Sequence, residues 1–401
     1  MPSNSNNAEA GRRGADVRSD CWVRIAPTNS GGIKLDLKSK VESMYGDSIR
    51  ALVSDELAAL GVRNANIEIE DAGALPFVIM ARVECGVRRL GVNVGDGYVP
   101  DFAAGTDYGT ERERFRRSRL YLPGNEPKFM LNAGLHKPDG VILDLEDSVA
   151  PAEKDAARLI VRNALRSVDF KGAERMVRIN QGAQGLEDLD YIVPHNVHSI
   201  LIPKVEGAEQ VAQVDIRIQE IQGGAGNAAH PIYLMPIVES AMGAIHAYEI
   251  ASASPNVVAL TIGLEDYTAD IGAEPTDEGL ESFWARSQVV NAARAAGVQP
   301  IDSVFADVVD VEGLRASAAR AKALGFEGKG CIHPSQIAVV RAVFAPTASE
   351  LANARRIVAA FEEAQAKGLA VVSLGSKMID PPVVKRALSV VKRAEAETEN
   401  G

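Results

Sequence analysis

Between residues 116 and 345, short apolar segments alternate with stretches of helical periodicity, and this alternation repeats eight times. We predict strands at 119–122, 141–145, 176–179, 199–203, 232–238, 257–262, 299–301 and 328–332, with a helix after nearly every one. Eight strand–helix units over about 230 residues match a (β/α)8 TIM barrel of the α/β class. A doubly wound open sheet is the alternative, but it usually has fewer strands and a glycine fingerprint after the first, which this sequence lacks.

The segments outside the barrel have a different pattern of apolar residues. Strand-like alternation at 21–25, 33–37 and 64–70 is interleaved with helical periodicity at 48–60 and 77–90, which predicts a small α+β domain. A long helix at 349–367, a Gly/Met/Pro segment at 374–382 and a final helix follow the barrel. We therefore expect a disordered tail at 1–14, an α+β domain at 15–92, a linker at 93–113, the barrel at 114–345, and C-terminal helices with a lid segment at 346–401.

Composition excludes several classes of protein. The net charge of -11 argues against a general nucleic-acid binder. No apolar run approaches the ~20 residues of a membrane helix, and the polar N-terminus has no signal-peptide core. The three cysteines, Cys21, Cys85 and Cys331, are far apart, so a disulfide scaffold or a structural zinc site is not expected. We predict a cytoplasmic protein without a membrane partner.

Polar residues follow the predicted barrel strands. In a TIM barrel these positions form the active site. The set is Asp144, Glu146, Asp147, Arg178, Lys204, Glu239, Glu265, Asp266, Asp302 and His333. Any one of them alone could be a helix cap or a surface charge, but together they are carboxylates with an Arg and a Lys. Hard oxygen ligands favour Mg²⁺ or Mn²⁺ over zinc, and the cations suit an anionic substrate.

Six motifs occur in a characteristic order: "RSRLYLPGNEPKF", "VILDLEDSVAPAEKDAAR", "VRIN", "LMPIVESAMG", "IGLEDYTADIG" and "GKGCIHPSQI". Over about 116–382 the chain thereby resembles the citrate lyase beta-subunit and malyl-CoA lyase (HpcH/HpaI aldolase) superfamily. The resemblance implies a (β/α)8 barrel in a homotrimer or hexamer that cleaves a hydroxyacyl thioester with Mg²⁺.

Carried over by motif, the resemblance assigns roles to single residues. Glu239 in "PIVES" and Asp266 in "GLED" match the metal ligands. Arg178 in "VRIN" matches the arginine that binds the substrate carboxylate and polarises the thioester carbonyl. Glu146 and Asp147 in "DLED" match the acidic pair beside the metal waters. The implied reaction is a retro-Claisen cleavage, in which an electrostatic donor stabilises the enolate that leaves.

Further residues are implied at the edges of the site. "KMIDPPVV" resembles a C-terminal lid whose aspartate, here Asp380, reaches the active site of a neighbouring subunit. Pro123, Gly124 and Lys329 lie where the family tends to hold the thioester's pantetheine or nucleotide arm. His333 fits either the site or a structural role before Pro334, and we favour the structural role.

The N-terminal domain resembles the citrate lyase gamma subunit, an acyl carrier protein. The matching segments are "SDCWVRIAP", "VESMYGDSIRALVSDELAALGV", "NANIEIEDAGAL" and "ARVECGVRR". The resemblance implies a phosphoribosyl-dephospho-CoA arm on a serine, but in ungapped register that position falls on Arg18, one residue before Ser19. Either Ser19 carries the arm or the domain has lost modification, since serine before aspartate is ordinary turn chemistry.

Several functions stay open from the sequence. The first is a lyase acting on a carrier-linked hydroxyacyl thioester, with an alpha-type transferase subunit as a partner. The second is a lyase acting on a free acyl-CoA, with the carrier-like domain kept for structure. A non-catalytic carrier or scaffold subunit is a third, against which the intact Glu239, Asp266 and Arg178 argue. A metal-dependent pyruvate aldolase is more distant, because it would have no use for a carrier domain.

Overall fold

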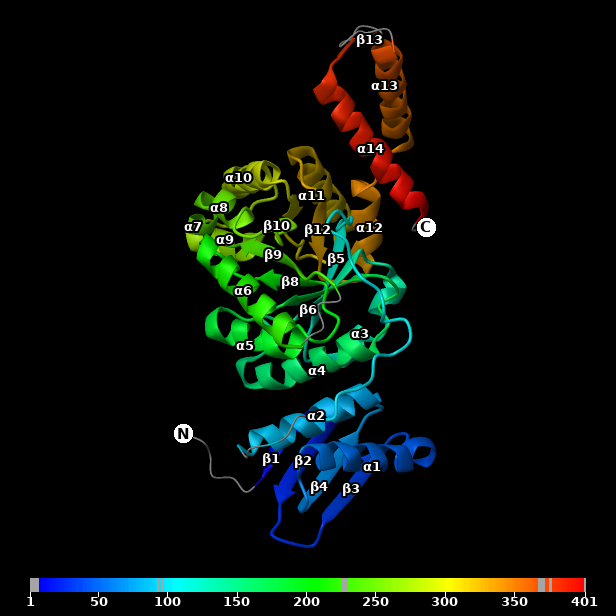
Figure 1. Ribbon diagram of the computed structural model, residues 1–401, viewed down its shortest axis with the longest axis vertical. Coiled ribbons are helices and arrows are strands. Elements are labelled where there is room, and N and C mark those ends of the chain that lie inside the picture. Colours follow the sequence, from blue (N-terminus) through cyan, green and yellow to red (C-terminus); the bar gives the residue numbers. More distant parts are fainter. Residues whose placement is uncertain are drawn as a thin grey trace.

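The computed structural model describes residues 7–91, 94, 97–225, 230–366, 372–374 and 377–399. Figure 1 shows a small N-terminal unit, a central barrel and a C-terminal helical hairpin, arranged in that order along the longest axis of the molecule. None of the helices in the described part of the chain combines the length and apolar character that crossing a bilayer demands.

The N-terminal unit is a four-stranded sheet covered by two helices. The strands are β1 (Ala8–Gly11), β2 (Cys21–Pro27), β3 (Ile33–Ser39) and β4 (Ala65–Asp71), and the helices are α1 (Glu42–Ala59) and α2 (Pro76–Arg89). The sheet order is β1-β2-β4-β3, with β3 parallel to β4 and the other pairs antiparallel. Ala65, Ile67 and Ile69 are buried while the residues between them are exposed, so one face of the sheet packs against the helices. The predicted α+β domain is confirmed.

The prediction of a disordered tail over 1–14 is wrong for part of that segment. Residues 8–11 form β1, in which Ala8 lies opposite Ile25 and Ala10 is buried. The free edge of β2 offers hydrogen-bonding partners to any adjacent backbone, and this pairing does not depend on side-chain composition. Residues 1–6 of the predicted tail lie outside the described residues.

Eight parallel strands form the closed barrel. They are β5 (Ser118–Pro123), β6 (Gly140–Asp144), β7 (Glu174–Arg178), β8 (Ser199–Ile202), β9 (Tyr233–Val238), β10 (Ala259–Ile262), β11 (Gln299–Asp302) and β12 (Gly328–Cys331). They pair in chain order, and β12 closes the barrel by pairing with β5. Nearly every strand residue is buried, as expected when both faces of a parallel sheet are covered. The predicted (β/α)8 fold is confirmed.

Helices surround the barrel (Figure 1). They are α3 (Pro127–Met130), α4 (Lys154–Ser167), α5 (Gly182–Ile192), α6 (Ala208–Ala225), α7 (Ala241–Ile245), α8 (Ala247–Ala251), α9 (Leu264–Ile271), α10 (Leu280–Ala296), α11 (Val311–Leu324) and α12 (Ser335–Phe344), with 3₁₀ turns at Ala133–His136 and Pro151–Glu153. The core has two parts: one cluster inside the barrel, including Ile142, Met176 and Leu201, and a larger one between strands and helices.

The C-terminal segment is a hairpin of α13 (Ala348–Ala366) and α14 (Pro381–Glu399). The short strands β13 (Val372–Leu374) and β14 (Lys377–Ile379) pair at its turn. In Figure 1 the two helices lie side by side and the turn points away from the barrel. The predicted helix at 349–367 and the final helix are therefore confirmed.

The N-terminal unit is docked on the barrel through α2 and α4. Phe77 and Ala81 of α2 belong to the same buried cluster as the helix-facing side of the barrel. The amide of Asn163 donates to the Phe77 carbonyl at 3.0 Å, and Arg162 forms a buried ion pair with Glu84. A continuous apolar interface with buried ion pairs holds the two parts in one arrangement.

The predicted linker at 93–113 lies against the barrel where it is described. Its residues from 97 onward form no helix or strand. The Arg175 guanidinium donates to the carbonyls of Thr106 and Tyr108, both at 2.9 Å, and the Tyr108 hydroxyl donates to the Ala173 carbonyl at 2.9 Å. The exact domain boundaries stay a prediction.

Glu56 of α1 is a buried carboxyl group at this junction. Its side chain is fully buried and forms no ion pair among the described residues. Burial, followed by the nearby Glu84 carboxylate, raises the pKa of Glu56 to about 8. The folded protein therefore retains a proton that the unfolded chain releases near the ordinary pKa of a glutamate.

This raised pKa predicts a pH-dependent stability. Because the folded pKa is above the unfolded one, the contribution of Glu56 is most favourable at low pH and is lost as pH rises from about 4.5 through about 8. Each pKa unit corresponds to about 1.4 kcal/mol, so Glu56→Gln should raise the free energy of unfolding by a few kcal/mol at pH 8 and little at pH 5. Thermal melts across this range test it, with Asp55→Asn on the exposed side of α1 as the control. Equal destabilisation of Glu56→Gln at both pH values would contradict it.

Candidate active site

A cavity of about 300 Å³ opens at the carboxyl ends of the barrel strands, the face on which TIM-barrel active sites lie. Its lining includes seven of the residues predicted from strand ends, namely Asp144, Asp147, Arg178, Glu239, Glu265, Asp266 and Asp302. Closure of the barrel thus brings together residues that are up to 158 positions apart in the sequence.

Arg178, at the end of β7, is held in place by Asp144 at the end of β6. The Arg178 Nε and Nη2 atoms each donate to an Asp144 carboxylate oxygen at 2.7 Å, a bidentate arrangement that fixes the guanidinium plane. Burial disfavours ionisation of Asp144, but the hydrogen bonds and charge of Arg178 outweigh it and hold the pKa of Asp144 below its ordinary value. Asp144 is therefore a positioning residue for Arg178.

Glu146 contacts the remaining edge of the same guanidinium. Its carboxylate lies 2.9 Å from Arg178 Nη1 and accepts a hydrogen bond from the Gln181 amide at 2.8 Å. Glu146 is buried, and this burial raises the pKa of its carboxyl group. Asp147, in contrast, is largely exposed at the mouth of the cavity.

Lys204 connects the acidic residues of the rim. Its ammonium lies 3.6 Å from Glu146, 3.5 Å from Asp147 and 3.4 Å from Asp266. Lys204 follows β8 with a φ of 50°, a left-handed conformation that is uncommon for a residue with a side chain. Such strain is characteristic of functional sites, and here it accompanies the meeting of three carboxylates with one cation.

Glu239 lies at the end of β9 and is almost completely buried. Its Oε2 atom accepts a hydrogen bond from the Lys204 backbone at 2.9 Å. A Cβ on Gly263 would lie 2.5 Å from Glu239 Oε1, so glycine is required for this close approach. Burial, together with the charges of Asp266 and Glu146, raises the pKa of Glu239 to about 7.

Glu239 and Asp266 fit a hard divalent cation. Mg²⁺ is typically held by one or two carboxylates and keeps several positions for water and substrate. Burial is the main cause of the raised pKa of Glu239, and the charges of Asp266 and Glu146 add to it, so a cation bound beside these carboxylates would favour their ionised forms. In the described part of the chain there is no group of three or more His, Cys, Asp or Glu side chains arranged for a metal ion, so zinc-type coordination by the protein alone is not favoured.

Lys329, Asp302 and His333, three further predicted residues, each contact another group of the protein. The Lys329 ammonium is buried and lies 2.8 Å from Asp302, which also pairs with Arg286 of α10. The charge of Lys329 is thus used in a buried ion pair, and its assignment to the thioester arm stays a prediction. His333 is exposed, and its Nδ1 atom accepts a hydrogen bond from the Ser335 backbone at 3.2 Å, which agrees with the structural role.

Pro123, Gly124 and Asp380 do not line this cavity. Pro123 ends β5, and the Gly124 backbone donates to the Asp144 carbonyl at 2.8 Å, so both lie beside the rim. Asp380 lies in the C-terminal hairpin, where its carboxylate accepts from the Val383 backbone at 3.1 Å at the start of α14. Their assigned roles stay predictions.

Arg119 and Tyr121 are among the cavity residues that the sequence analysis missed. Arg119 and Tyr121 alternate along β5 and both line the cavity, and the Arg178 guanidinium lies 5.4 Å from the centre of the Tyr121 ring. Polar residues at alternate positions of an otherwise apolar barrel strand were the available signal, because these positions face the barrel interior.

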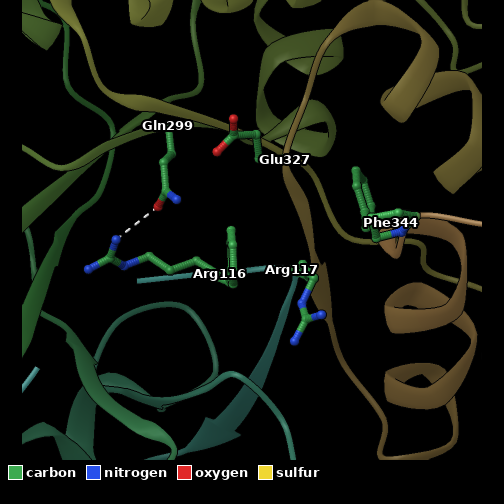
Figure 2. A pocket seen from close by; sticks show the side chains of 7 residues that line it. Arg116, Arg117, Gln299, Glu327 and Phe344 are labelled. Carbon is green, nitrogen blue, oxygen red and sulfur yellow. Dashed lines mark hydrogen bonds between the residues drawn. The ribbon is translucent and has the colours of Figure 1, made fainter. Parts of the chain in front are cut away.

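A second hollow, at the amino-terminal end of the barrel, is only about 10 Å³ in volume. Figure 2 shows Arg116, Gln299 and Glu327 among its lining side chains. Arg116 donates to Gln299 at 2.8 Å and forms a fully buried ion pair with Glu174. Because this space holds at most a water molecule and its polar groups are paired, this end of the barrel serves stability.

Comparisons with known proteins agree with this geometry. The family model described as HpcH/HpaI aldolase/citrate lyase matches residues 117–334, and that of a C–C bond lyase of the TIM-barrel fold matches 281–397. The model of an acyl carrier family described as malonate decarboxylase delta subunit matches 9–90.

Individual relatives are similar over most of the barrel and hairpin. The citrate lyase subunit beta of Haemophilus influenzae is 40% identical over 285 residues, which cover 71% of this chain and 98% of that protein. The L-malyl-CoA/beta-methylmalyl-CoA lyase of Cereibacter sphaeroides is 35% identical over 308 residues, covering 70% and 95%. The crystal structure of CitE from Mycobacterium tuberculosis with magnesium, acetoacetate and coenzyme A has a TM-score of 0.59 and 34% identity, covering 71% and 100%.

A TIM barrel with an acidic, arginine-containing cavity at its carboxyl face is the framework of a carbon–carbon lyase, and the matched models describe the same class. The chain belongs to the HpcH/HpaI aldolase/citrate lyase family. Its N-terminal unit matches an acyl carrier family model, so a carrier-like unit precedes the lyase barrel.

The bidentate contact predicts the effect of changing Arg178. Lysine retains the charge but provides no planar fork for Asp144 and a substrate oxygen. We expect Arg178→Lys to lower kcat of the lyase reaction by roughly 10²–10³, the loss typical of one electrostatic donor. Steady-state kinetics test this, with a melting curve to verify folding and Arg217→Lys on exposed α6 as the control. Wild-type kinetics in Arg178→Lys would show that the guanidinium geometry is not needed.

Proposed function

We propose that this protein cleaves a 3-hydroxyacyl thioester of the citryl, citramalyl or malyl type into an acyl thioester and an α-keto acid. The observation that carries the proposal is the grouping of Glu239, Asp266 and Arg178 around one cavity. The names of the relatives support this substrate class, since they include a citrate lyase subunit and a malyl-CoA lyase.

In this proposal, Glu239 and Asp266 hold Mg²⁺ or Mn²⁺. Bound there, the ion would supply Lewis acidity and orient the carboxylate and hydroxyl oxygens of the substrate. The magnesium in the crystal structure of the CitE relative supports this choice. Gly263 and the Lys204 backbone fix the Glu239 carboxylate in the orientation that such a ligand requires.

Arg178 stabilises the enolate that forms on the thioester half. Three of its five N–H groups are directed at Asp144 and Glu146, which leaves two for the thioester oxygen. Asp144 and Glu146 prevent the guanidinium from reorienting, so little rearrangement is needed as negative charge develops on that oxygen. The Arg178 guanidinium also lies over the Tyr121 ring, 5.4 Å from its centre.

Protons move through carboxylates in this mechanism. The hydroxyl proton passes to a carboxylate base, the electrons of the broken carbon–carbon bond move onto the thioester half, and the enolate carbon is then protonated. Glu146 and Asp147 are the acidic pair of the same chain. We assign Asp380 to a neighbouring subunit's cavity, because its own hairpin points away from its own barrel (Figure 1).

An assembly of several copies follows from this assignment, and we propose a homotrimer or hexamer acting in the cytoplasm. Large apolar side chains are exposed on α7 to α10, including Tyr248, Leu280, Phe283 and Trp284. Exposed apolar groups of this extent are typical of protein interfaces. The three cysteines are buried and free, which suits a reducing compartment.

The metal ligands provide the direct test. We expect Glu239→Gln and Asp266→Asn each to abolish Mg²⁺-dependent turnover while the melting temperature stays near that of the wild type, because each variant removes one anionic ligand. Glu312→Gln, on the exposed face of α11 and outside the cavity, is the control and should retain turnover. Full activity in either ligand variant would disprove the assignment, as would unaltered Mn²⁺ binding by calorimetry.

A second candidate concerns the form of the thioester. If Ser19 bore a prosthetic arm, the N-terminal domain would be a carrier loaded with the help of an alpha-type transferase subunit. The docking of α2 on α4 favours the alternative, a free acyl-CoA substrate and a structural N-terminal domain. A mobile carrier would have to break this buried interface in each cycle.

The surroundings of Ser19 agree with a structural role. Ser19 is half-buried at a φ of 55°, and its backbone donates to the Ala72 carbonyl at 3.1 Å. The adjacent Asp20 is buried and bonded to Arg82 at 2.8 Å, and Arg82 also donates to the Asn125 carbonyl of the barrel at 3.3 Å. A modified serine needs access for a transferase, whereas this segment is fixed against the barrel.

Intact-mass spectrometry of the protein purified from its native host separates the two candidates. We expect an unmodified chain, and Ser19→Ala should cleave a free hydroxyacyl-CoA as fast as the wild type. A mass increment on the Ser19 peptide that matches a phosphoribosyl-dephospho-CoA arm would instead establish a carrier-linked lyase.

A further inference from the structure

Arg119 is a charged residue enclosed by the barrel. It is the second residue of β5, and its side chain points into the barrel interior, where it is 0% exposed. It is among the residues that line the active-site cavity. A buried guanidinium without a partner is costly, so its presence calls for a compensating interaction.

The contacts of Arg119 do not provide that compensation. Its Nη1 atom donates a long hydrogen bond of 3.4 Å to the Thr261 hydroxyl of β10. Its Nε and Nη2 atoms have no hydrogen-bond partner within the described part of the chain. Burial lowers the pKa of Arg119, as expected for a cation without a counter-charge beside it.

The other cations at the cavity are already neutralised. Arg178 is paired with Asp144 and Glu146, and Lys204 lies within 3.6 Å of Glu146. Of the described residues that line the cavity, Arg119 is the cation without an ion pair. Arg119 therefore offers a ligand positive charge in the barrel interior, in addition to the N–H groups that Arg178 keeps for the thioester oxygen.

Thr261 connects this charge to the cavity. Its hydroxyl oxygen accepts the Arg119 hydrogen bond, which leaves the hydroxyl hydrogen free to donate to a ligand. Thr261 also lines the cavity. It lies two residues before Gly263, and Gly263 lies against Glu239. A ligand bound near Glu239 thus extends towards Thr261 and Arg119 when it carries a second polar group.

We propose that Thr261 and Arg119 form a second anion subsite that binds an additional carboxylate on the α-keto acid half of the substrate. This inference rests on the proposed function and refines it. A carboxylate there accepts from the Thr261 hydroxyl and is stabilised by the guanidinium directly behind it. The enzyme is then selective for substrates whose departing keto acid is a dicarboxylate. Arg119 is a positioning residue in this scheme, because it acts through Thr261.

The selectivity argument follows from desolvation. A site with a buried unpaired polar group strongly rejects a ligand that leaves that group without a partner. This discrimination is stronger than the discrimination of an apolar pocket against a ligand with an additional polar group. A substrate with a single carboxylate on its keto acid half leaves Arg119 uncompensated. A substrate with two places an anion next to the guanidinium.

The experiment compares two CoA thioesters with the Mg²⁺-loaded enzyme. Citryl-CoA releases a keto acid with two carboxylates, and malyl-CoA releases one with a single carboxylate. We expect the wild type to favour citryl-CoA in kcat/KM, and Arg119→Met to lower the citryl/malyl ratio of kcat/KM by about 10- to 100-fold. Thr261→Val should lower the ratio in the same direction, and Arg119→Lys should retain part of it. Arg315→Met on exposed α11 is the control for loss of an arginine and should leave the ratio unchanged.

Binding provides a readout that a purely structural role would not change. Calorimetry with oxaloacetate and with pyruvate should show that Arg119→Met and Thr261→Val weaken oxaloacetate binding selectively. Equal losses for both ligands, or an unchanged citryl/malyl ratio, would overturn the subsite. If Arg119→Met does not fold, Thr261→Val and Arg119→Lys decide by the same ratio. Failure of the wild type to cleave citryl-CoA, malyl-CoA and citramalyl-CoA would refute the proposed function itself, whereas cleavage of citryl-CoA and malyl-CoA without selectivity would refute only this inference.

Discussion

Eight parallel strands can close into a barrel only when their carboxyl ends all lie on one face, and the candidate site depends on this closure. Asp144 and Arg178 end neighbouring strands, so their bidentate contact is a direct result of strand pairing. Glu239 and Asp266 come after β9 and β10, which are also neighbours in the barrel. The opposite face contains paired charges such as Arg116 and Glu174, beside a hollow of only about 10 Å³.

Charge balance explains how the site combines rigidity with binding capacity. Arg178 and Lys204 are surrounded by carboxylates, and these pairs fix the rim without leaving free positive charge there. Glu239 is buried close to other acids, and burial is the main cause of its raised pKa. Arg119, inside the barrel, is a buried cation without an anion beside it. A metal ion and a substrate with several carboxylates would together supply both of these groups with an opposite charge.

The N-terminal unit resembles a carrier protein but is fixed against the barrel. Carrier proteins present a serine on an accessible segment, but here the Ser19 segment is fixed by Arg82 against the barrel. The α2 helix shares its buried cluster with the barrel, so the unit extends the enzyme's core. A resemblance to a carrier family therefore does not by itself establish that the unit carries an acyl group, because mobility depends on the interface and not on the fold.

The sequence by itself determined the number and order of the barrel strands, since an apolar period is a local property of a few residues. It also determined the residues at strand ends, which is why Glu239, Asp266 and Arg178 were found before their geometry was known. Only the tertiary structure shows that the Lys329 ammonium on β12 pairs with Asp302 on the neighbouring strand β11. The same holds for the edge strand β1, for Arg119 beneath Thr261, and for the docking of α2. Each depends on contacts between residues far apart in sequence, which local periodicity does not encode.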